Sequence, residues 1–375
     1  MKFIVSSNTL LKNLQAISGS LGSSSALPIL ENFLFRLEDN VLYVTASDLE
    51  TTMTASVPLS MADEDGVVAV PAKILLDTLK TLADIPLTIT IDTSSNYMVE
   101  LSTGEGKYKL AGLSGENYPR APVMLNANVL EMSSSVLAHA IAKTIIATGN
   151  DEMRPVMAGV FCDFTPDDLT FVATDSHRLV RYRRFDTHAQ AAVSFIMPKK
   201  PLQQLKNLLA SEETTVKMEF NQTNAAYSFR NINLICRLIE GRYPNYEAVI
   251  PRDNPRKLIV DRTIFLNALR RVSIFANQST LQVRLRISGQ ELQLGAEDID
   301  YANEARERLS CSFEGEDIEI GFNSRFLADM LNNVDTEEVM LELSEPNKAG
   351  ILRPVSPGDE TKELLMLVMP VMLNQ

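Results

Sequence analysis

The pattern of apolar and polar positions along the chain repeats three times, at an interval of about 125 residues. Each repeat begins with a strand-like run that ends in a residue able to cap a helix: Lys2–Ser6, Val129–Ser133 and Lys257–Asp261. Apolar residues at helical spacing follow, and the equivalent residues Leu10, Leu137 and Phe265 lie 127 and 128 positions apart. This agreement favours three related domains over chance self-similarity in an ordinary α+β protein.

A hairpin pattern follows the first helix of every repeat, as two alternating or apolar runs separated by turn residues. The paired runs are Phe33–Leu37 with Val41–Thr45, Val160–Phe164 with Thr170–Ala173, and Val283–Ile287 with Leu292–Gly295. An acid comes soon after each second run, and Asp48, Asp175 and Asp298 lie 127 and 123 positions apart. A second helix then starts near Pro71, Pro198 or Asn323, because proline in a first turn and asparagine at a cap are common helix starts.

The periodicity therefore predicts six helices, at residues 9–18, 71–83, 135–148, 198–209, 262–276 and 324–333. The apolar faces of these helices are rich in Leu, Ile and Phe and should pack on the sheets that the hairpins form. The predicted fold class is α+β, with three repeated domains that each hold two helices packed on antiparallel sheets. The domains are expected at residues 1–123, 124–253 and 254–375, with proline-containing linkers near 120–127 and 250–256.

The net charge becomes informative when it is counted separately for the six predicted helices and for the rest of the chain. The chain of 375 residues carries 48 acidic and 35 basic residues, a formal charge of −13, which excludes a nucleic-acid binder that is basic over its whole surface. The six predicted helices, however, hold eleven bases and only the acids Asp77 and Asp329, so they carry +9 and the remainder carries −22. Positive helices are thus separated from negative strands and loops.

The polar residues of the helices also fall on stripes at the spacing that places them on one face, as Lys73, Asp77 and Lys80 do. If the six faces share a common side, they suit a polyanion held through its phosphates without sequence preference. No set of aromatic residues accompanies them, so duplex DNA is favoured over stacked single strands. The candidate DNA-binding residues are Lys12, Gln15, Lys73, Lys80, Lys143, Arg154, Lys199, Lys200, Lys206 and Arg271.

Three like units joined edge to edge would leave two unpaired ends, which is an aggregation hazard. Head-to-tail closure with a second copy would remove both ends. The sequence therefore favours a closed homo-oligomer.

An enzyme is disfavoured by the same sequence. Asp175-Ser176-His177-Arg178 offers an acid, a hydroxyl and an imidazole, but adjacent residues do not form a Ser-His-Asp relay. The three histidines lack metal-ligand spacing, and the faint phosphate-loop pattern at Gly104–Lys107 is better explained as a hairpin turn. No catalytic residue, metal site or cofactor is predicted.

The expected compartment is the cytoplasm. Cys162, Cys236 and Cys311 form no C-x-x-C pair and are expected as reduced thiols. The N-terminus turns polar too early for a signal peptide, and the apolar run Leu364–Leu373 is too short to span a bilayer and is interrupted by Pro370.

Several motifs make the chain resemble the bacterial DNA sliding clamps, the β subunits of DNA polymerase III, over its whole length. They are Met1-Lys2-Phe3, Leu27–Leu30, Val70–Lys73, Ala173–Leu179, Gly241–Tyr246 and Val368–Pro370. The resemblance implies a ring-shaped head-to-tail homodimer whose inner helices surround duplex DNA and whose antiparallel sheets lie outside. It also implies a processivity factor without catalytic residues, near the nucleoid, that serves the DNA polymerase III alpha subunit, the clamp loader and other proteins with a clamp-binding motif.

Two protein contacts are implied by the resemblance as well. A peptide-binding pocket between the second and third domains would be formed by Thr174, Ser176, His177, Arg178, Leu179, Pro244, Val249, Asn323, Phe326, Val368, Met369, Pro370, Val371 and Met372. The dimer contact would join Tyr108 and Leu110 of one subunit to Ile274 and Phe275 of the other. The Met- and Val-rich C-terminus agrees with an adaptable apolar surface, although Leu364–Leu367 also suits a buried last strand.

The chain departs from the family at positions that bear on DNA and peptide contact. Ser24 replaces a basic loop residue, Pro155-Val156 replaces a tyrosine pair, and Ala248 replaces an arginine near the pocket. We therefore give more weight to Lys73, Lys199 and Lys200. The alternative to a DNA clamp is a ring-shaped scaffold for proteins that does not encircle DNA.

Overall fold

The computed structural model describes residues 1–22, 27–94, 96–355 and 360–373, and Ser24 lies outside them. The chain forms two compact units, of which the first comprises Met1–Ala138 and Gln203–Leu238 and the second His139–Leu202 and Ile239–Gln375. The first unit holds a five-stranded and a nine-stranded sheet, here sheets A and B, and the second holds a nine-stranded and a four-stranded sheet, sheets C and D.

The predicted threefold repeat is confirmed, because one order of elements occurs three times: a strand, a helix, four strands, a helix and three strands. In the first repeat these are β1 Lys2–Ser6, α1 Ser7–Ile17, β2 Asn32–Glu38, β3 Val41–Ser47, β4 Thr51–Pro58, β6 Gly66–Pro71, α2 Ala72–Thr81, β7 Pro86–Ile91, β8 Met98–Ser102 and β9 Lys107–Ala111.

The second and third repeats follow the same order. The second consists of β11 Asn128–Ser133, α3 Ser134–Thr144, β12 Gly159–Phe164, β13 Leu169–Thr174, β14 Arg178–Arg184, β15 Val193–Pro198, α4 Lys199–Leu209, β16 Thr215–Phe220, β17 Asn224–Phe229 and β18 Ile232–Arg237. The third consists of β19 Arg256–Asp261, α5 Arg262–Ser273, β20 Gln282–Ser288, β21 Glu291–Asp298, β22 Asn303–Ser310, β24 Ile318–Asn323, α6 Ser324–Asn332, β25 Glu338–Leu343, β26 Gly350–Pro354 and β27 Lys362–Val368. Outside the pattern lie the short strands β5 Met61–Ala62, β10 Leu113–Ser114 and β23 Ser312–Glu314.

Sheets B and C share the order of eight strands, and both cross a border between repeats. Sheet B runs β10-β6-β2-β3-β4-β18-β17-β16-β11, and sheet C runs β15-β12-β13-β14-β27-β26-β25-β19-β23. In both, the fourth strand of one repeat pairs antiparallel with the last strand of the next, as Ala55 faces Ile232 and Arg178 faces Val368. The repeats are therefore joined by continuous hydrogen-bonded sheet.

Sheets A and D each hold half of this pattern. Sheet A runs β5-β1-β7-β8-β9, and sheet D runs β22-β21-β20-β24. The last strand of the first repeat, β9, and the fourth strand of the third repeat, β22, are thus end strands of their sheets. These are the two strands whose counterparts pair with each other in sheets B and C.

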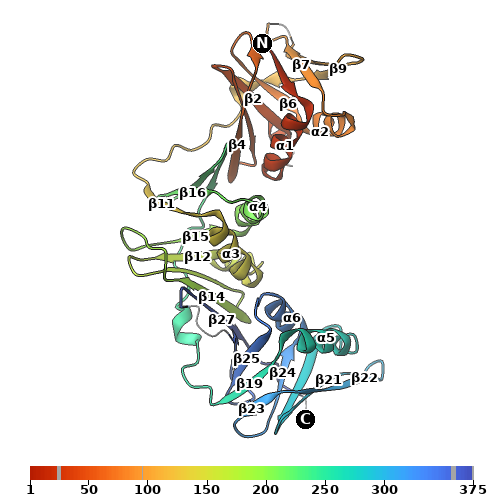
Figure 1. Ribbon diagram of the computed structural model, residues 1–375, viewed down its shortest axis with the longest axis vertical. Coiled ribbons are helices and arrows are strands. Elements are labelled where there is room, and N and C mark those ends of the chain that lie inside the picture. The colour runs from red at the N-terminus through yellow and green to blue at the C-terminus, as the bar shows by residue number, and fades with distance from the viewer. Residues whose placement is uncertain (23–26, 95, 356–359, 374–375) are drawn as a thin grey trace. The chain divides into compact units, whose positions relative to one another are not determined.

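The predicted apolar helix faces are confirmed within each unit. Helix α1 packs on β3 and β4 and beside α2, and α5 packs on β20, β21 and β22 and beside α6 (Figure 1). The side chains that face the sheets are buried: Leu10, Leu14, Ile17, Leu75 and Leu79 in the first unit, and Phe265, Leu269, Val272, Leu327 and Leu331 in the second.

The helix starts show which capping expectations hold. The Ser6 hydroxyl accepts from the Thr9 amide at 3.1 Å, the Asp261 carboxylate accepts from the Ile264 amide at 2.7 Å, and the Asn323 side chain caps α6. Pro71 and Pro198, by contrast, are not in a first turn, because each is the last residue of a strand that pairs across its sheet. Their helices begin one residue later.

The three matching acids form the same kind of turn. Carboxylate oxygens of Asp48, Asp175 and Asp298 each accept the backbone N–H two residues ahead, at 3.1, 3.0 and 3.1 Å. In the first two turns the following residue, Leu49 or Ser176, has a φ of 77°. Aspartate suits this position because its side chain holds such a turn closed. The spacing marked these residues, and their role is to end the hairpin.

Candidate functional site

The pairing of β14 with β27 brings the two halves of the predicted peptide pocket together. Leu179 faces Leu367 across the ladder, and the Met369 amide donates to the His177 carbonyl at 2.8 Å just past its end. The alternative that Leu364–Leu367 is a buried strand is also correct, since β27 is buried at these residues. The chain then leaves the sheet, and in the tail Met369–Leu373 the side chains of Met369 and Met372 are exposed.

Arg178 is the centre of the ion pairs in this cluster. Its guanidinium donates to Asp175 at 3.0 Å and to Asp329 of α6 at 2.7 Å, and it stacks 4.6 Å from the centre of the Phe326 ring. The His177 ring also lies against Phe326, with centroids 6.1 Å apart. These contacts position α6 beside the turn at Asp175, so Phe326 and residues 174–179 form one surface.

The tail is tied to this surface by backbone contacts. The Val371 amide donates to the Gly321 carbonyl of β24 at 2.8 Å. A Cβ on Gly321 would lie 2.6 Å from the Val371 carbonyl oxygen, so the tail can approach β24 only because residue 321 is glycine. Past this bridge, the Met372 side chain is exposed.

The segment that contains Pro244 and Val249 packs against sheet C. Its neighbours Tyr243, Tyr246 and Ile250 pack on a cluster that contains Leu179 and Leu367. Val249 itself is 58% exposed, so it is available to a ligand.

Glu247 anchors this segment through arginines of β14. Its carboxylate accepts from Arg181 at 2.7 Å and Arg183 at 3.3 Å, and Arg181 also donates to Glu363 of β27 at 3.0 Å. Burial alone would lower the pKa of Arg181, but the charges of Glu363 and Glu247 outweigh it and raise this pKa. Arg181 therefore stays charged, and the sequence patterns did not indicate this network.

Arg154 lies beside the pocket cluster and not on a helix face. Its guanidinium donates to Asp151 at 2.8 Å and to the Ser176 hydroxyl. The prediction that Arg154 joins the DNA-binding set therefore receives no support from its surroundings. Its hydroxyl partner belongs to the predicted pocket.

The other predicted DNA-binding residues lie on helices but differ in their availability. Lys12, Gln15, Lys73 and Lys80 are exposed on α1 and α2, although Lys80 pairs with Asp77 at 3.3 Å. On α4, Lys200 is exposed and Lys199 and Lys206 are partly exposed, and Lys199 donates to Asn150 at 3.2 Å. Arg271 of α5 is exposed but binds Glu307 with two hydrogen bonds, at 2.8 and 2.7 Å.

The prediction that Lys143 binds DNA is wrong. Its side chain is only 7% exposed, and its ammonium donates to the Asn333 carbonyl and to Asp335 at 2.8 Å. The Asn333 side chain donates back to the Lys143 carbonyl at 2.6 Å. This lysine therefore fastens the end of α3 to the end of α6 and does not present its charge to DNA.

The interaction between Lys143 and Asp335 should stabilise the fold by an amount that depends on pH. Burial would raise the pKa of Asp335, but the hydrogen bond and charge of Lys143 outweigh it and this pKa lies below 3.8. A lowered acid pKa in the folded state stabilises the fold above the unfolded pKa of about 3.9, and this stabilisation is lost as the pH falls through the folded value. A double-mutant cycle of Lys143→Met and Asp335→Asn should give a coupling of about 1 kcal/mol at pH 7, because Asp335 is largely exposed.

Denaturant unfolding of the unaltered protein and the three variants at several pH values measures this coupling. It should decline as the pH is lowered from about 4. The exposed Lys80–Asp77 pair is the matched control and should couple by less than about 0.5 kcal/mol. A Lys143–Asp335 coupling no larger than that of the control would show that the contact does not fasten α3 to α6.

Three of the four predicted dimer residues are exposed, and the fourth, Leu110, is not. Tyr108 on β9 is 39% exposed, and Ile274 and Phe275, just after α5, are 77% and 40% exposed. Leu110 is buried in its own sheet, because alternate residues of a strand point to opposite faces. Its side chain is therefore not available to a partner, although the backbone of β9 is.

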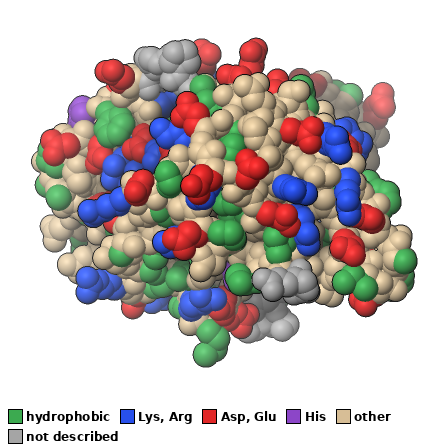
Figure 2. Space-filling view, turned by 90° about the horizontal axis from the view of Figure 1, so that it is seen from below, with side chains coloured by type: hydrophobic (Ala, Val, Ile, Leu, Met, Phe, Trp, Pro, Cys, Tyr) green, Lys and Arg blue, Asp and Glu red, His purple; other side chains and the backbone are tan. Residues whose placement is uncertain are grey.

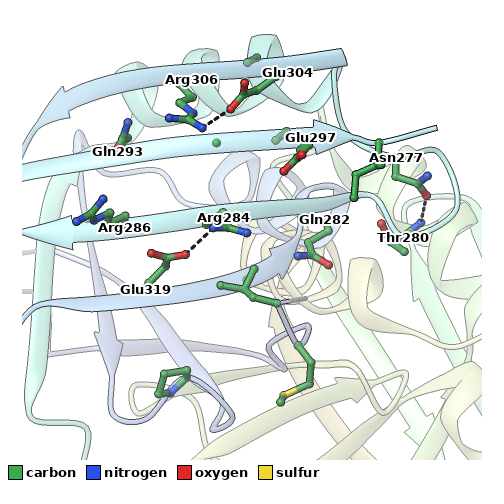
Figure 3. A pocket seen from close by; sticks show the side chains of 18 of the residues that line it. Asn277, Thr280, Gln282, Arg284, Arg286, Gln293, Glu297, Glu304, Arg306 and Glu319 are labelled. Atoms are coloured by element: carbon green, nitrogen blue, oxygen red, sulfur yellow. Dashed lines mark hydrogen bonds and ion pairs between the residues drawn. The ribbon is translucent and has the colours of Figure 1, made fainter. Parts of the chain in front are cut away.

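A cavity of about 1260 Å³ lies on sheet D, and the sequence patterns did not indicate it. Among the described residues, Met372 is the only predicted pocket residue in its lining. The lining comes mainly from alternate residues of β20, β21 and β22 (Figure 3). Each strand alone looked like an ordinary half-exposed strand, so the hollow appears only when the strands are aligned.

The described part of the chain holds no group of three or more His, Cys, Asp and Glu residues able to bind a metal ion. Cys162 and Cys236 are buried and Cys311 is partly exposed, and all three are free thiols. Among the residues placed by the structure, no helix has the length and apolar character to cross a membrane.

The whole chain is similar to known proteins. Sequence models of the DNA polymerase III beta subunit match it domain by domain: the N-terminal domain over residues 1–122, the central domain over 131–245 and the C-terminal domain over 247–371. The curated "Beta sliding clamp" proteins of Synechococcus elongatus and Vibrio cholerae are each 29% identical, with 100% of both chains covered.

Solved structures agree. The sliding clamp of Pseudomonas aeruginosa bound to griselimycin is 27% identical with a TM-score of 0.93, and that of Bartonella birtlesii is 28% identical with a TM-score of 0.92. Both comparisons cover 100% of each chain.

Proposed function

The chain belongs to the bacterial DNA sliding clamps, the beta subunits of DNA polymerase III, and from this premise we propose that two copies close into a ring around duplex DNA. The ring would hold the polymerase on its template and so confer processivity. It would do so without catalytic residues of its own, in the cytoplasm near the nucleoid.

The proposal of a ring rests on the end strands β9 and β22. In sheets B and C, a fourth strand pairs with the last strand of the following repeat, and β22 and β9 are the one fourth and one last strand left over. Pairing β22 of one copy with β9 of another would complete a third sheet of the same order. Because each copy offers one of each strand, two such contacts close the assembly and leave neither strand at an open edge.

The helices supply the proposed contact with DNA. Lys12 and Lys73 are exposed and have no hydrogen-bond or ion-pair partner among the described residues, so both ammonium groups can meet phosphates. Lys199, Lys200 and Lys206 add a second basic group on α4. Phosphate contacts of this kind give affinity without sequence preference, which suits a protein that moves along DNA.

The surface formed by residues 174–179, Phe326 and the tail is the proposed site for partner peptides. It combines exposed Val249 and Met372 with the ordered Arg178–Phe326 stack. Methionine side chains adapt to different apolar partners, so one surface can serve several proteins. We infer that the DNA polymerase III alpha subunit, the clamp loader and other proteins with a clamp-binding motif dock here.

The proposed domains remain residues 1–123, 124–253 and 254–375.

A linearisation assay tests encirclement. The protein is placed on a singly nicked circular duplex by the clamp loader of the same cell and isolated by gel filtration. We expect it to remain on the circle and to be lost after the circle is cut with a restriction enzyme, because a ring slides off free ends. Blocking the ends with a tightly bound protein should restore retention.

The salt dependence of retention on DNA distinguishes this proposal from the alternative of a scaffold that does not encircle DNA. A purely electrostatic complex loses roughly 10³-fold or more in affinity between about 50 and 200 mM salt, whereas a closed ring is held by topology. Retention on the nicked circle should therefore survive this change. Equal loss from circular and linear DNA would favour the scaffold.

A further inference from the structure

The cavity on sheet D lies on the face of the sheet that turns away from α5. Leu285, Leu292 and Leu294 are buried on the α5 side, and Arg284, Arg286 and Gln293 alternate with them on the other. The tail residues Met372 and Leu373 and the loop at Glu345–Asn347 form part of the lining. We name this cavity the sheet D trough.

Gly295 forms the open floor of the trough. A Cβ there would meet only the Ala305 carbonyl oxygen, at 3.9 Å, and Gly295 has no positive φ. The ladder with β22 runs past it in unbroken register, and the pairing of β21 with β20 ends at it. Glycine weakens a strand interior and is typical of a place where another backbone approaches closely. The described chain supplies no such backbone above Gly295, which leaves the position open to a ligand.

The charges of the trough are partly paired and partly unpaired. Arg284 binds Glu319 at 2.8 Å, and Arg306 binds Glu304 (Figure 3). Arg286, Glu297 and Asp300 line the same trough without an ion-pair partner among the described residues. On the face drawn in Figure 2, acidic and basic side chains are likewise intermixed. A ligand with both signs of charge would match these groups.

The spacing of Arg286 and Glu297 fits an extended peptide. Arg286 faces Gln293 in the register, and Glu297 lies four residues along β21 from Gln293. Four residues of strand span about 13 Å. An extended polypeptide would therefore place a carboxylate beside Arg286 and a basic side chain beside Glu297 when these lie about four residues apart.

The trough is continuous with the proposed peptide site. Met372 lines it, and the tail that carries Met372 is bridged to β24. On the other side, the Asn323 amide of the proposed peptide site donates to the Thr280 carbonyl, at 3.4 Å, and Thr280 lines the trough. A peptide that leaves the site past Met372 enters the trough directly.

We propose that the sheet D trough binds the charged segment that flanks the docking motif of a partner protein, with an acid at Arg286 and a base at Glu297. This inference rests on the proposed function of the peptide site. It adds a second element to recognition: the apolar motif docks at the tail, and the flanking charges select among partners.

Fluorescence anisotropy with synthetic peptides tests the proposal. One peptide carries only the clamp-binding motif of the DNA polymerase III alpha subunit. Four others extend it, at either end, by Gly/Ser residues with Asp and Lys four residues apart in either order. The measured quantity is the ratio of affinities for an extended and the bare peptide. We expect at least one extension to raise affinity about tenfold, by an amount that falls as salt is increased.

Three variants locate the effect. Arg286→Glu should bring the ratio close to one, and a peptide with Lys in place of its Asp should restore it. Gly295→Val should also bring the ratio close to one, because its side chain covers the floor. Arg36→Glu is the control: this exposed arginine of β2 pairs with Glu38 and is absent from the lining, so the ratio should persist.

The outcomes distinguish the two proposals. If the bare motif peptide does not bind, the proposed peptide site is wrong. If the bare peptide binds but no extension changes affinity, the trough is not a binding site. A gain that survives Arg286→Glu would likewise overturn the assignment.

Discussion

Replacing Ile274 and Phe275 together with glutamate should convert the dimer into a monomer. Light scattering of the unaltered protein should give a mass about twice 41.6 kDa, and the double variant should give 41.6 kDa. Ile274 and Phe275 are exposed in the single chain, at 77% and 40%, so the fold should tolerate the change. Burying two such side chains contributes roughly 3–6 kcal/mol, and burying two carboxylates in their place adds a penalty, so dissociation should increase by about 10³-fold or more.

Ile264→Glu is the matched control for the dimer prediction. Ile264 lies on α5, shortly before Ile274, and is also largely exposed, at 55%. This variant should keep the dimer mass, because the proposed contact lies at β22 and the residues just after α5. A dimer mass that persists in the double variant over a wide dilution series would place the interface elsewhere.

Ending the chain at Val368 should abolish peptide binding and leave the dimer intact. The truncation keeps β27 but removes Met369, Met372 and the bridge from Val371 to Gly321. We expect affinity for the motif peptide to fall at least about 100-fold, or roughly 2.7 kcal/mol, which is typical when central apolar contacts are lost. The dimer should survive because the tail borders β24, at the opposite edge of sheet D from β22.

Gly321→Ala provides a test of the same site without a deletion. Its Cβ would lie 2.6 Å from the Val371 carbonyl oxygen, so the tail must move away from β24 and affinity should fall in the same direction. Gly104→Ala is the control, because a Cβ at Gly104 meets nothing within 4 Å. If both the truncation and Gly321→Ala bind the peptide normally, the tail is not part of the site.

The features that the sequence predicted well depend on neighbours in the chain. The hairpin of β2 and β3 and the caps at Ser6 and Asp261 follow from turn and capping residues within a few positions. The threefold repeat added the longer pattern, and it placed the three turn aspartates before their role was visible. The two end strands β9 and β22 follow from the same repeat once the strand order is known.

The features that it missed depend on residues far apart in the chain. Lys143 looked like part of a basic helix stripe, but its acid partner is 192 positions away, at Asp335. Leu110 was expected at the dimer contact from the family resemblance, but its side chain is buried within its own unit. The Arg181–Glu247–Glu363 network and the sheet D trough each join several strands, so no single segment carries their pattern.

The sheets that cross between repeats also set the order in which the chain can fold during synthesis. Strand β4 pairs with β18, and Ser56 bonds to Asn231 across 175 positions; β14 in turn pairs with β27 near the end of the chain. At about 5–20 residues per second, a ribosome needs roughly 10–35 s to supply the partner of β4. Until then β4 is an open edge in the nascent chain, a hazard for misassembly with a neighbouring copy. Sheet C cannot close until translation is nearly finished.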